Sequence, residues 1–384
     1  MTEDTRDATD QIETNVPEDR VLRTSQLRTG GRRPKGAFDA IALLRRLEKE
    51  YDLGPWDTWR RADQGASNDS WFVETASGEV VVRRSHDLKT AAGLRFEQAL
   101  IAHLRTQGYP APAIVPTRTG ALSVTLDGVH HMVTEQLPGT TYRWTSPDRL
   151  PTAAQGLGWF HRLVDDLPAD QTAEESSSLA MINATARERL LLALSVMEPL
   201  LPPDERAEAE QDVRWLCSEM LVVHDELAGR LPELTYLITH GSYGPTAVLL
   251  QDDHLSGVLD FDRAAHDLLT LDLATAVWVF CSASPFRRRV LGLDLGRLTW
   301  FLQEYATEYK ASAADLTMLA TALRARRLLT VSKKCENFLT KSALSPGEPG
   351  RAEKLTRTAK TEATQCRWLK QHASDLTRAA HPGP

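Results

Sequence analysis

The segment 237–262 constrains the fold of this chain more than any other part of the sequence. It reads LITHGSYGPTAVLLQDDHLSGVLDFD, and two apolar runs, 247–250 and 255–259, flank a short polar turn. Apolar runs of this length on either side of a polar turn predict a β-hairpin. A loop that begins at His240 precedes the hairpin, and Asp260 follows it. We therefore expect this unit to place a loop beside a carboxylate that can bind a cation.

Composition narrows the class of protein. The chain has 384 residues, enough for two lobes or domains, and its hydrophobic content of 42% is typical of a globular protein. The net charge of −7 argues against a general nucleic-acid binder. No apolar run approaches the roughly 18 to 20 residues of a membrane span, and the first residues lack an apolar signal-peptide segment. We therefore expect no nucleic-acid and no membrane partner.

The four cysteines are far apart and lack the spacing of metal ligands. In a chain of this length such cysteines are expected to be free thiols in a reducing cytoplasm. They are Cys217, Cys281, Cys335 and Cys366.

The pattern of secondary structure changes along the chain. Residues 1–35 are polar and charged, which predicts a disordered tail, with a partner-binding arm as the alternative. Residues 36–138 combine two amphipathic helices with several strand-like runs. Residues 139–384 are mostly helical in spacing, and the only strands expected there are the hairpin and its lead-in. Helices are expected over 38–51, 94–107, 153–164, 177–198, 204–227, 268–282, 295–309, 314–338 and 354–379.

The opening segment resembles the aminoglycoside phosphotransferase and choline kinase-like family, which shares the protein-kinase fold. That family usually shows HGD-x-x-x-x-N, a hairpin and then a DF-x motif. His240, Gly241, the hairpin and the Asp-Phe pair that begins at Asp260 match this pattern. Ser242 stands where the family has its catalytic Asp, and Ala247 stands where it has a metal-binding Asn. The resemblance is therefore to a family member with an altered catalytic loop.

The resemblance implies a fold of the α+β class, a bilobal protein-kinase-like fold. Residues 36–138 would form a small β-rich N-lobe that binds the nucleotide. Residues 139–384 would form a large helical C-lobe with the catalytic loop and the acceptor-binding helices. ATP and Mg²⁺ are the cofactors that the resemblance implies.

The same resemblance assigns a nucleotide site. The turn 64–69 corresponds to the nucleotide loop, where small residues let backbone N–H groups approach phosphates, although it can equally be an ordinary hairpin turn. Arg83 aligns with the kinase Lys that holds the α- and β-phosphates and pairs with a helix Glu, here Glu97. The alternative is a solvated strand-edge Arg and an ordinary helix-face Glu. The backbone of 132–139 would bind adenine. The candidate cofactor-binding residues are Gly65, Ser67, Asn68, Arg83, Glu97, Glu135 and Leu137.

The acidic end of the hairpin is the candidate metal site. Mg²⁺ commonly takes one or two carboxylates, together with phosphates and waters. Asp260 is the expected anchor, and Asp262 is either a second ligand or a structural acceptor. His240 is expected to brace the loop rather than to act as an acid or base. Asp272 resembles a family Asp that forms hydrogen bonds near the loop. The candidate catalytic residues are His240, Ser242, Asp260 and Asp262, and the candidate metal ligands are Asp260 and Asp262.

One C-terminal helix carries a cluster of basic residues. Three of them, Arg324, Arg327 and Lys334, share a face at three- and four-residue steps. A solvated face is the default expectation, and a dock for an acidic substrate is the alternative. The full cluster is Arg324, Arg326, Arg327, Lys333 and Lys334.

The two substitutions in the loop affect the expected chemistry. The Ser242 hydroxyl is not a base near neutral pH, and loss of a general base lowers a rate by about 10²- to 10⁴-fold. Phosphoryl transfer depends mostly on positioning and charge neutralisation, so a slow kinase is allowed. Asp262 is the nearest carboxylate that could substitute. Ala247 offers no side-chain oxygen to a second metal ion.

Two functions are compatible with these features. The first is an ATP-dependent phosphotransferase that acts on a hydroxyl of a natural product, or on Ser/Thr of a biosynthetic peptide in a lanthipeptide-type pathway. The second is a pseudokinase that binds nucleotide or peptide as a scaffold for a partner enzyme of the pathway. An unrelated helical binding protein would require the hairpin resemblance to be accidental. The retained residues favour the phosphotransferase.

Overall fold

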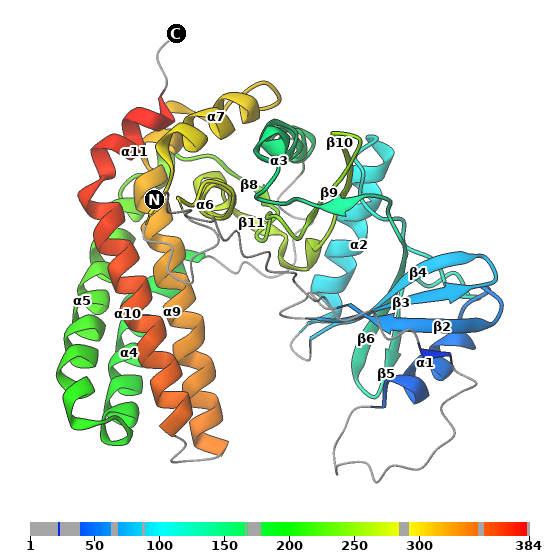
Figure 1. Ribbon diagram of the computed structural model, residues 1–384, viewed down its shortest axis with the longest axis horizontal. Coiled ribbons are helices and arrows are strands. Elements are labelled where there is room, and N and C mark those ends of the chain that lie inside the picture. The colour runs from blue at the N-terminus through cyan, green and yellow to red at the C-terminus, as the bar shows by residue number, and fades with distance from the viewer. Residues whose placement is uncertain are drawn as a thin grey trace, which may run out of the picture. The chain divides into compact units, whose positions relative to one another are not determined.

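The computed structural model describes residues 22–23, 39–62, 68–86, 89–165, 167, 178–283, 292–344 and 349–381. The chain divides into two compact units (Figure 1). The first comprises Met1–Asp87 and Val115–Gln136, and the second comprises Leu88–Ile114 and Leu137–Pro384.

The first unit is a six-stranded antiparallel sheet with one helix. The strand order is β1-β2-β3-β4-β6-β5. Alternate residues of the central strands are buried, as period-2 patterning requires. The strands are β1 (Leu22–Arg23), β2 (Trp56–Arg61), β3 (Asp69–Thr75), β4 (Gly78–Arg84), β5 (Val124–Leu126) and β6 (Val129–Glu135).

Helix α1 (Ala40–Glu48) closes the core of this unit. Its N-terminus is capped by Asp39, whose carboxylate accepts a hydrogen bond from the Ala42 amide. The leucines of one helical face are buried in a cluster that includes Trp71 and Val73 of β3. This amphipathic packing gives the sheet one covered face.

The second unit is mainly helical and contains two small sheets. One sheet has the order β10-β9-β7, and in the other β11 pairs with β8. Figure 1 shows α4, α5, α9 and α10 running side by side as a bundle, and each packs on at least two of the others. The strands are β7 (Thr140–Thr141), β8 (Tyr236–Thr239), β9 (Val248–Gln251), β10 (His254–Val258) and β11 (Ala265–Leu268).

The helices of the second unit include α2, which lies between two segments of the first unit in sequence. The α-helices are α2 (Ala91–Thr106), α3 (Leu150–Val164), α4 (Ala184–Met197), α5 (Pro203–Ala228), α6 (Leu269–Phe280), α7 (Leu295–Tyr305), α8 (Ala313–Thr317), α9 (Leu319–Leu344), α10 (Pro349–Gln371) and α11 (Ala373–Ala380). The short 3-10 helices are η2 (Pro147–Arg149), η4 (Ser178–Ile182), η5 (Glu198–Leu200), η6 (Leu231–Glu233) and η7 (Phe261–Arg263).

The structure differs from the sequence-based expectations in several places. Strand β11 is additional, because its four residues gain their strand partner only from distant β8. The expected helix 314–338 is divided at Met318 into α8 and α9, and the expected helix 354–379 is divided at His372 into α10 and α11. The segment Leu88–Ile114 belongs to the helical unit rather than to the β-rich one. The predicted disordered tail lies outside the described residues, except for Leu22–Arg23 in β1.

All four cysteines are free thiols, as expected, and are buried, and the reducing compartment stays a prediction. Among the described residues, no helix is both long enough and apolar enough to cross a membrane.

The helical bundle contains a buried ion cluster. Arg324 of α9 lies 2.5 Å from Glu219 of α5, and both side chains are nearly inaccessible to solvent. Arg324 also pairs with Glu226, and Lys370 of α10 lies 2.8 Å from Glu219. Arg327 lies over the ring of Trp278. Arg324 and Arg327 of the predicted basic cluster are therefore largely covered by protein, against the expectation of a solvated face, whereas Lys333 and Lys334 are exposed.

We expect Arg324→Leu to lower the free energy of unfolding by about 3 kcal/mol, because it leaves Glu219 buried without its main partner. The matched control is Arg214→Leu, which removes the exposed Arg214–Glu210 pair of α5 and should change stability by less than about 0.5 kcal/mol. Chemical denaturation measures both values. Equal effects of the two substitutions would contradict a structural role for the buried cluster.

Candidate functional site

The loop after β8 begins with a buried histidine. His240 has no exposed surface, and its Nε2 donates a hydrogen bond to the Leu259 carbonyl at 3.0 Å. Its Nδ1 then accepts from the Ser242 amide at 3.4 Å. Burial lowers the pKa of His240, which keeps the ring neutral. These contacts support the predicted role of His240 in bracing the loop.

A buried carboxylate on α6 holds the same loop. Asp272 accepts hydrogen bonds from the His240 amide at 2.7 Å and the Gly241 amide at 2.9 Å. His161 of α3 donates to it through Nε2 at 3.1 Å, and the other ring nitrogen of His161 lies 2.7 Å from the Tyr305 hydroxyl. The prediction that Asp272 forms hydrogen bonds near the loop is confirmed.

The charge of Asp272 is stabilised by its partners. Burial alone would raise the pKa of this carboxyl group, but the hydrogen bond and charge of His161, together with His240, outweigh that effect and lower the pKa. Asp272 is therefore an anion at neutral pH. Sequence analysis did not identify His161 as its partner, because the two residues are far apart in sequence.

Gly241 occupies a position that only glycine fills well. Its φ is +74°, and a Cβ there would lie 2.5 Å from the Arg263 carbonyl oxygen. The loop backbone therefore contacts the segment that follows Asp262. This close approach fixes the loop after β8 against the end of the hairpin.

The end of the hairpin has an unusual backbone conformation. Asp260 has a φ of +66°, in the left-handed region that non-glycine residues seldom adopt, and its side chain is exposed. Ser242 donates its hydroxyl to the Asp260 carbonyl at 3.0 Å. Phe261 is buried, and its ring centroid lies 5.0 Å from that of His240. Three other described aspartates share this conformation, so Asp260 is distinguished by the contact of its carbonyl with the loop after β8.

The carboxylates available here fit a metal ion that arrives with phosphates. Within the described ranges, no group of three or more His, Cys, Asp or Glu side chains could hold a metal. Asp260 is exposed and Asp262 is partly buried, so one or two carboxylates are available. Mg²⁺ is commonly bound in this way, with substrate phosphates and waters as its other ligands. Ala247 is buried and contributes no side-chain oxygen.

A lysine that sequence analysis missed lies beside this centre. Lys89 Nζ is 3.0 Å from the buried carboxylate of Glu97, and it donates to the Asp262 carbonyl at 2.9 Å. The same ammonium group therefore connects α2 to the turn at η7. The only sequence signal is a lysine immediately before Thr90, which caps α2. The pairing of Arg83 with Glu97 stays a prediction, and Lys89 is an observed partner of Glu97.

The remaining candidate residues are distributed over the two units. Gly65 and Ser67 lie outside the described residues. Asn68 accepts a hydrogen bond from the His86 amide at 3.0 Å. Arg83 on β4 stands opposite Ser70 of β3 and Met132 of β6, and Glu135 ends β6. Asn68 immediately precedes β3, Arg83 lies on β4 and Glu135 is the last residue of β6. These three strands are neighbours in the sheet of the first unit. Leu137 belongs to the second unit and lies against Gly257 of β10.

Comparison with known structures defines the class of this fold. The amicoumacin kinase in complex with AMP-PNP and Ca²⁺ matches with a TM-score of 0.59, 15% identity, and coverage of 85% of this chain and 93% of that one. The microcompartment-associated aminopropanol kinase matches with a TM-score of 0.60, 18% identity, and coverage of 88% and 98%. The fold is therefore bilobal and protein-kinase-like, of the α+β class.

The family follows from the sequence comparisons. Residues 58–328 match the model of the phosphotransferase enzyme family, and the chain belongs to that family. The homoserine kinase of Sinorhizobium fredii is 26% identical over 234 residues, which cover 60% of this chain and 66% of that enzyme.

We expect Asp272→Asn to lower the free energy of unfolding by about 3 kcal/mol, because it removes the buried charge that His161 and the loop amides stabilise. The control is Asp225→Asn, which alters an exposed Asp–His contact and should cost less than about 0.5 kcal/mol. Chemical denaturation measures the free energy of unfolding of both variants. A loss no larger than that of the control would show that the charge of Asp272 is dispensable.

The lowered pKa of His240 predicts a pH dependence of stability. Below about pH 6.5 this histidine binds a proton in the unfolded chain, whereas the buried ring of the folded protein stays neutral to a lower pH. The free energy of unfolding therefore falls as the pH drops from about 6.5 towards the folded pKa, by at most about 1.4 kcal/mol per pH unit from this group. His240→Gln keeps a donor for Leu259 and should reduce this slope. Denaturation midpoints at several pH values measure it, and identical slopes would contradict the burial effect.

Proposed function

We propose that this protein is an ATP-dependent phosphotransferase that transfers the γ-phosphoryl group to a hydroxyl of its acceptor. The observation that carries the proposal is the loop that Asp272 braces, because this loop places the Ser242 hydroxyl against the carbonyl of Asp260, whose carboxylate is exposed. Family membership and the nucleotide-bound kinase of the same fold support the choice of ATP. The four free, buried cysteines support a cytoplasmic location.

Each candidate residue has a role in this proposal. Asp260, with or without Asp262, would hold Mg²⁺, which neutralises charge on the transferring phosphoryl group. Arg83 would bind phosphate through its planar guanidinium, and Lys89 would hold Glu97 of α2 next to the metal-binding turn. The backbone at Glu135 and Leu137 would bind adenine. Backbone groups of the nucleotide loop at Gly65, Ser67 and Asn68 would approach the phosphates.

Position 242 carries no side chain that could accept the proton of the acceptor hydroxyl. The Ser242 hydroxyl donates to the Asp260 carbonyl and is not basic near neutral pH. A loose phosphoryl-transfer transition state tolerates this loss, because positioning and electrostatics supply most of the catalysis. Asp262 is our candidate for the substitute base, since it follows the metal anchor by two residues and is partly solvated.

The acceptor is proposed to be a small hydroxyl compound or a Ser/Thr side chain of a biosynthetic peptide, including one of lanthipeptide type. The printed names of a homoserine kinase and an aminopropanol kinase among the similar proteins favour a small acceptor. Ser242 and the buried Ala247 favour the second candidate, a pseudokinase that serves as a scaffold for a partner enzyme. Turnover by the purified protein alone would exclude that second function.

The test is incubation with ATP, Mg²⁺ and candidate acceptors, followed by mass detection of a phosphorylated product. Asp260→Asn should lower kcat by at least about 100-fold, because it removes the metal anchor. Asp252→Asn is a matched control, since Asp252 is also an exposed, left-handed Asp but lies in the hairpin turn, and it should retain activity. Absence of any product, or turnover unaffected by Asp260→Asn, would refute the proposed activity.

The role of position 242 can be tested in the same assay. Ser242→Asp supplies a carboxylate where the family has one and should raise kcat about ten-fold or more. Its effect is read against wild type at saturating acceptor. An unchanged or lower kcat would show that another group already accepts the proton.

A further inference from the structure

The metal-binding turn of the proposed function, residues 260–263, is held through its backbone by two side chains of the second unit. Ser242 donates its hydroxyl to the Asp260 carbonyl at 3.0 Å, and Lys89 donates to the Asp262 carbonyl at 2.9 Å. Both bonds use a main-chain oxygen rather than a carboxylate oxygen. The main chain of the turn is therefore fixed by contacts that do not consume its acidic side chains.

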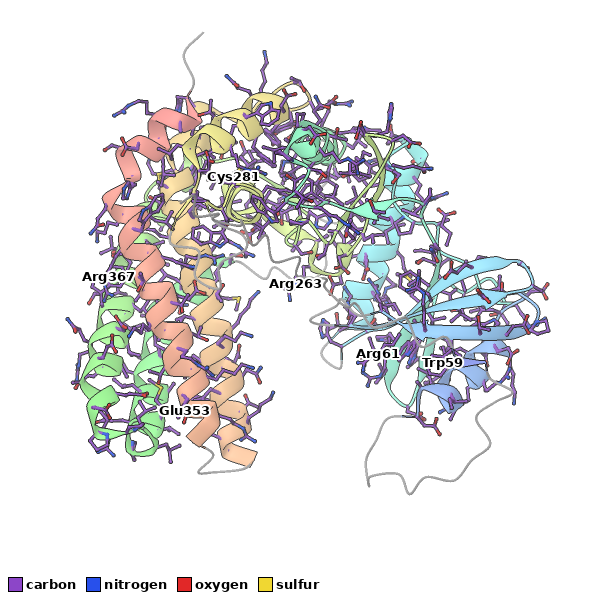
Figure 2. The ribbon with its side chains drawn as sticks, in the orientation of Figure 1. Trp59, Arg61, Arg263, Cys281, Glu353 and Arg367 are labelled. Atoms are coloured by element: carbon purple, nitrogen blue, oxygen red, sulfur yellow. The ribbon has the colours of Figure 1, made fainter. Side chains whose placement is uncertain are left out.

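Lys89 occupies a position that contributes little to the helix that follows it. It precedes Thr90, the N-cap of α2, and its Cε would lie 3.8 Å from a Cβ added at Gly93 in the first helical turn. The macrodipole of a helix disfavours positive charge at this end. Helix α2 packs on η7, whose last residue, Arg263, is labelled in Figure 2. The lysine is therefore better explained by its contact with the metal-binding turn than by a contribution to α2.

A buried glutamate of α2 balances the charge of this lysine. The Nζ of Lys89 lies 3.0 Å from Oε2 of Glu97, and the two side chains are 9% and 1% exposed. An ammonium group beside Asp262 would otherwise be drawn to the carboxylate of that residue, where it would compete with a metal ion. Because Glu97 supplies a negative charge next to the ammonium group, Lys89 can donate to the Asp262 carbonyl instead.

We propose that Lys89 is a positioning residue for the metal-binding turn, and that Glu97 keeps its ammonium group on the Asp262 carbonyl and away from the carboxylate. The inference rests on the proposed phosphotransferase function, in which Asp260, with or without Asp262, holds Mg²⁺. Lys89 acts through the turn, because it fixes the main chain from which the carboxylates project. Loss of an outer partner of this kind typically lowers metal affinity about 10- to 100-fold.

The test is the gain in ADP affinity that Mg²⁺ provides, measured by calorimetric titration of the full chain with ADP in Mg²⁺ and in EDTA. Lys89→Met should reduce this gain about ten-fold, because the carboxylates are no longer held in place for the metal, while the affinity in EDTA should change by less than about two-fold. Lys89→Arg can form both contacts and should retain most of the gain. The matched control is Lys360→Met, which removes an exposed pair with Glu208 and should resemble wild type.

A double variant tests the part assigned to Glu97. Glu97→Gln removes the charge that holds the ammonium group away from the Asp262 carboxylate, so it should also reduce the gain from Mg²⁺. In the double variant Lys89→Met with Glu97→Gln, no ammonium group remains to compete, so the gain should stay within about two-fold of that of Lys89→Met alone. Losses that add would show that Glu97 acts on the site by another route and would overturn its assigned role.

Hydrogen exchange of the free protein tests the turn without nucleotide or metal. Amides of residues 259–266 should exchange about ten-fold faster in Lys89→Met than in wild type, because a charge-assisted hydrogen bond to the turn is lost. Lys89→Arg and Lys360→Met should match wild type. Thermal denaturation of each variant verifies that the fold is retained.

The two measurements separate this inference from the proposed function. A gain from Mg²⁺ that Lys89→Met leaves unchanged, an equal loss of ADP affinity with and without Mg²⁺, or unchanged exchange of the turn would overturn the inference. The proposed function would still stand if wild type phosphorylated an acceptor. Conversely, a wild type without turnover would count against the proposed function, and the exchange measurement would still decide whether Lys89 positions the turn.

Discussion

The arrangement of this site depends on one buried carboxylate. Asp272 is anionic in the interior, so its stability requires that every nearby donor stay in place. Those donors are two consecutive loop amides and the ring of His161, which α3 supplies. The carboxylate therefore joins α3, α6 and the loop after β8 into one rigid group. Because Gly241 is held in this way, its close contact with Arg263 also fixes the turn that carries Asp260 and Asp262.

The two altered positions of the loop lie outside this supporting network. Ser242 contacts the Asp260 carbonyl and the His240 ring but makes no bond to Asp272, and Ala247 is a small residue that fits a buried position. The frame of the candidate site can thus persist with Ser242 and Ala247 at the positions where the family resemblance implies an Asp and an Asn. This separation explains how a chain can retain the family fold with a different catalytic constellation, and it makes chemistry at position 242 testable without loss of the fold.

Much of the fold and part of the site could be predicted from sequence, for physical reasons that differ between residues. The hairpin and the position of Asp260 follow from short apolar runs and a polar turn, which are local signals. Lys89 and His161 were missed, because their partners Glu97, Asp262, Tyr305 and Asp272 are brought together only by tertiary packing. Strand β11 was missed for the same reason. Helical spacing grouped Arg324, Arg327 and Lys334 on one face, but spacing cannot tell which of these side chains protein covers: Arg324 and Arg327 are largely buried, and Lys334 is exposed.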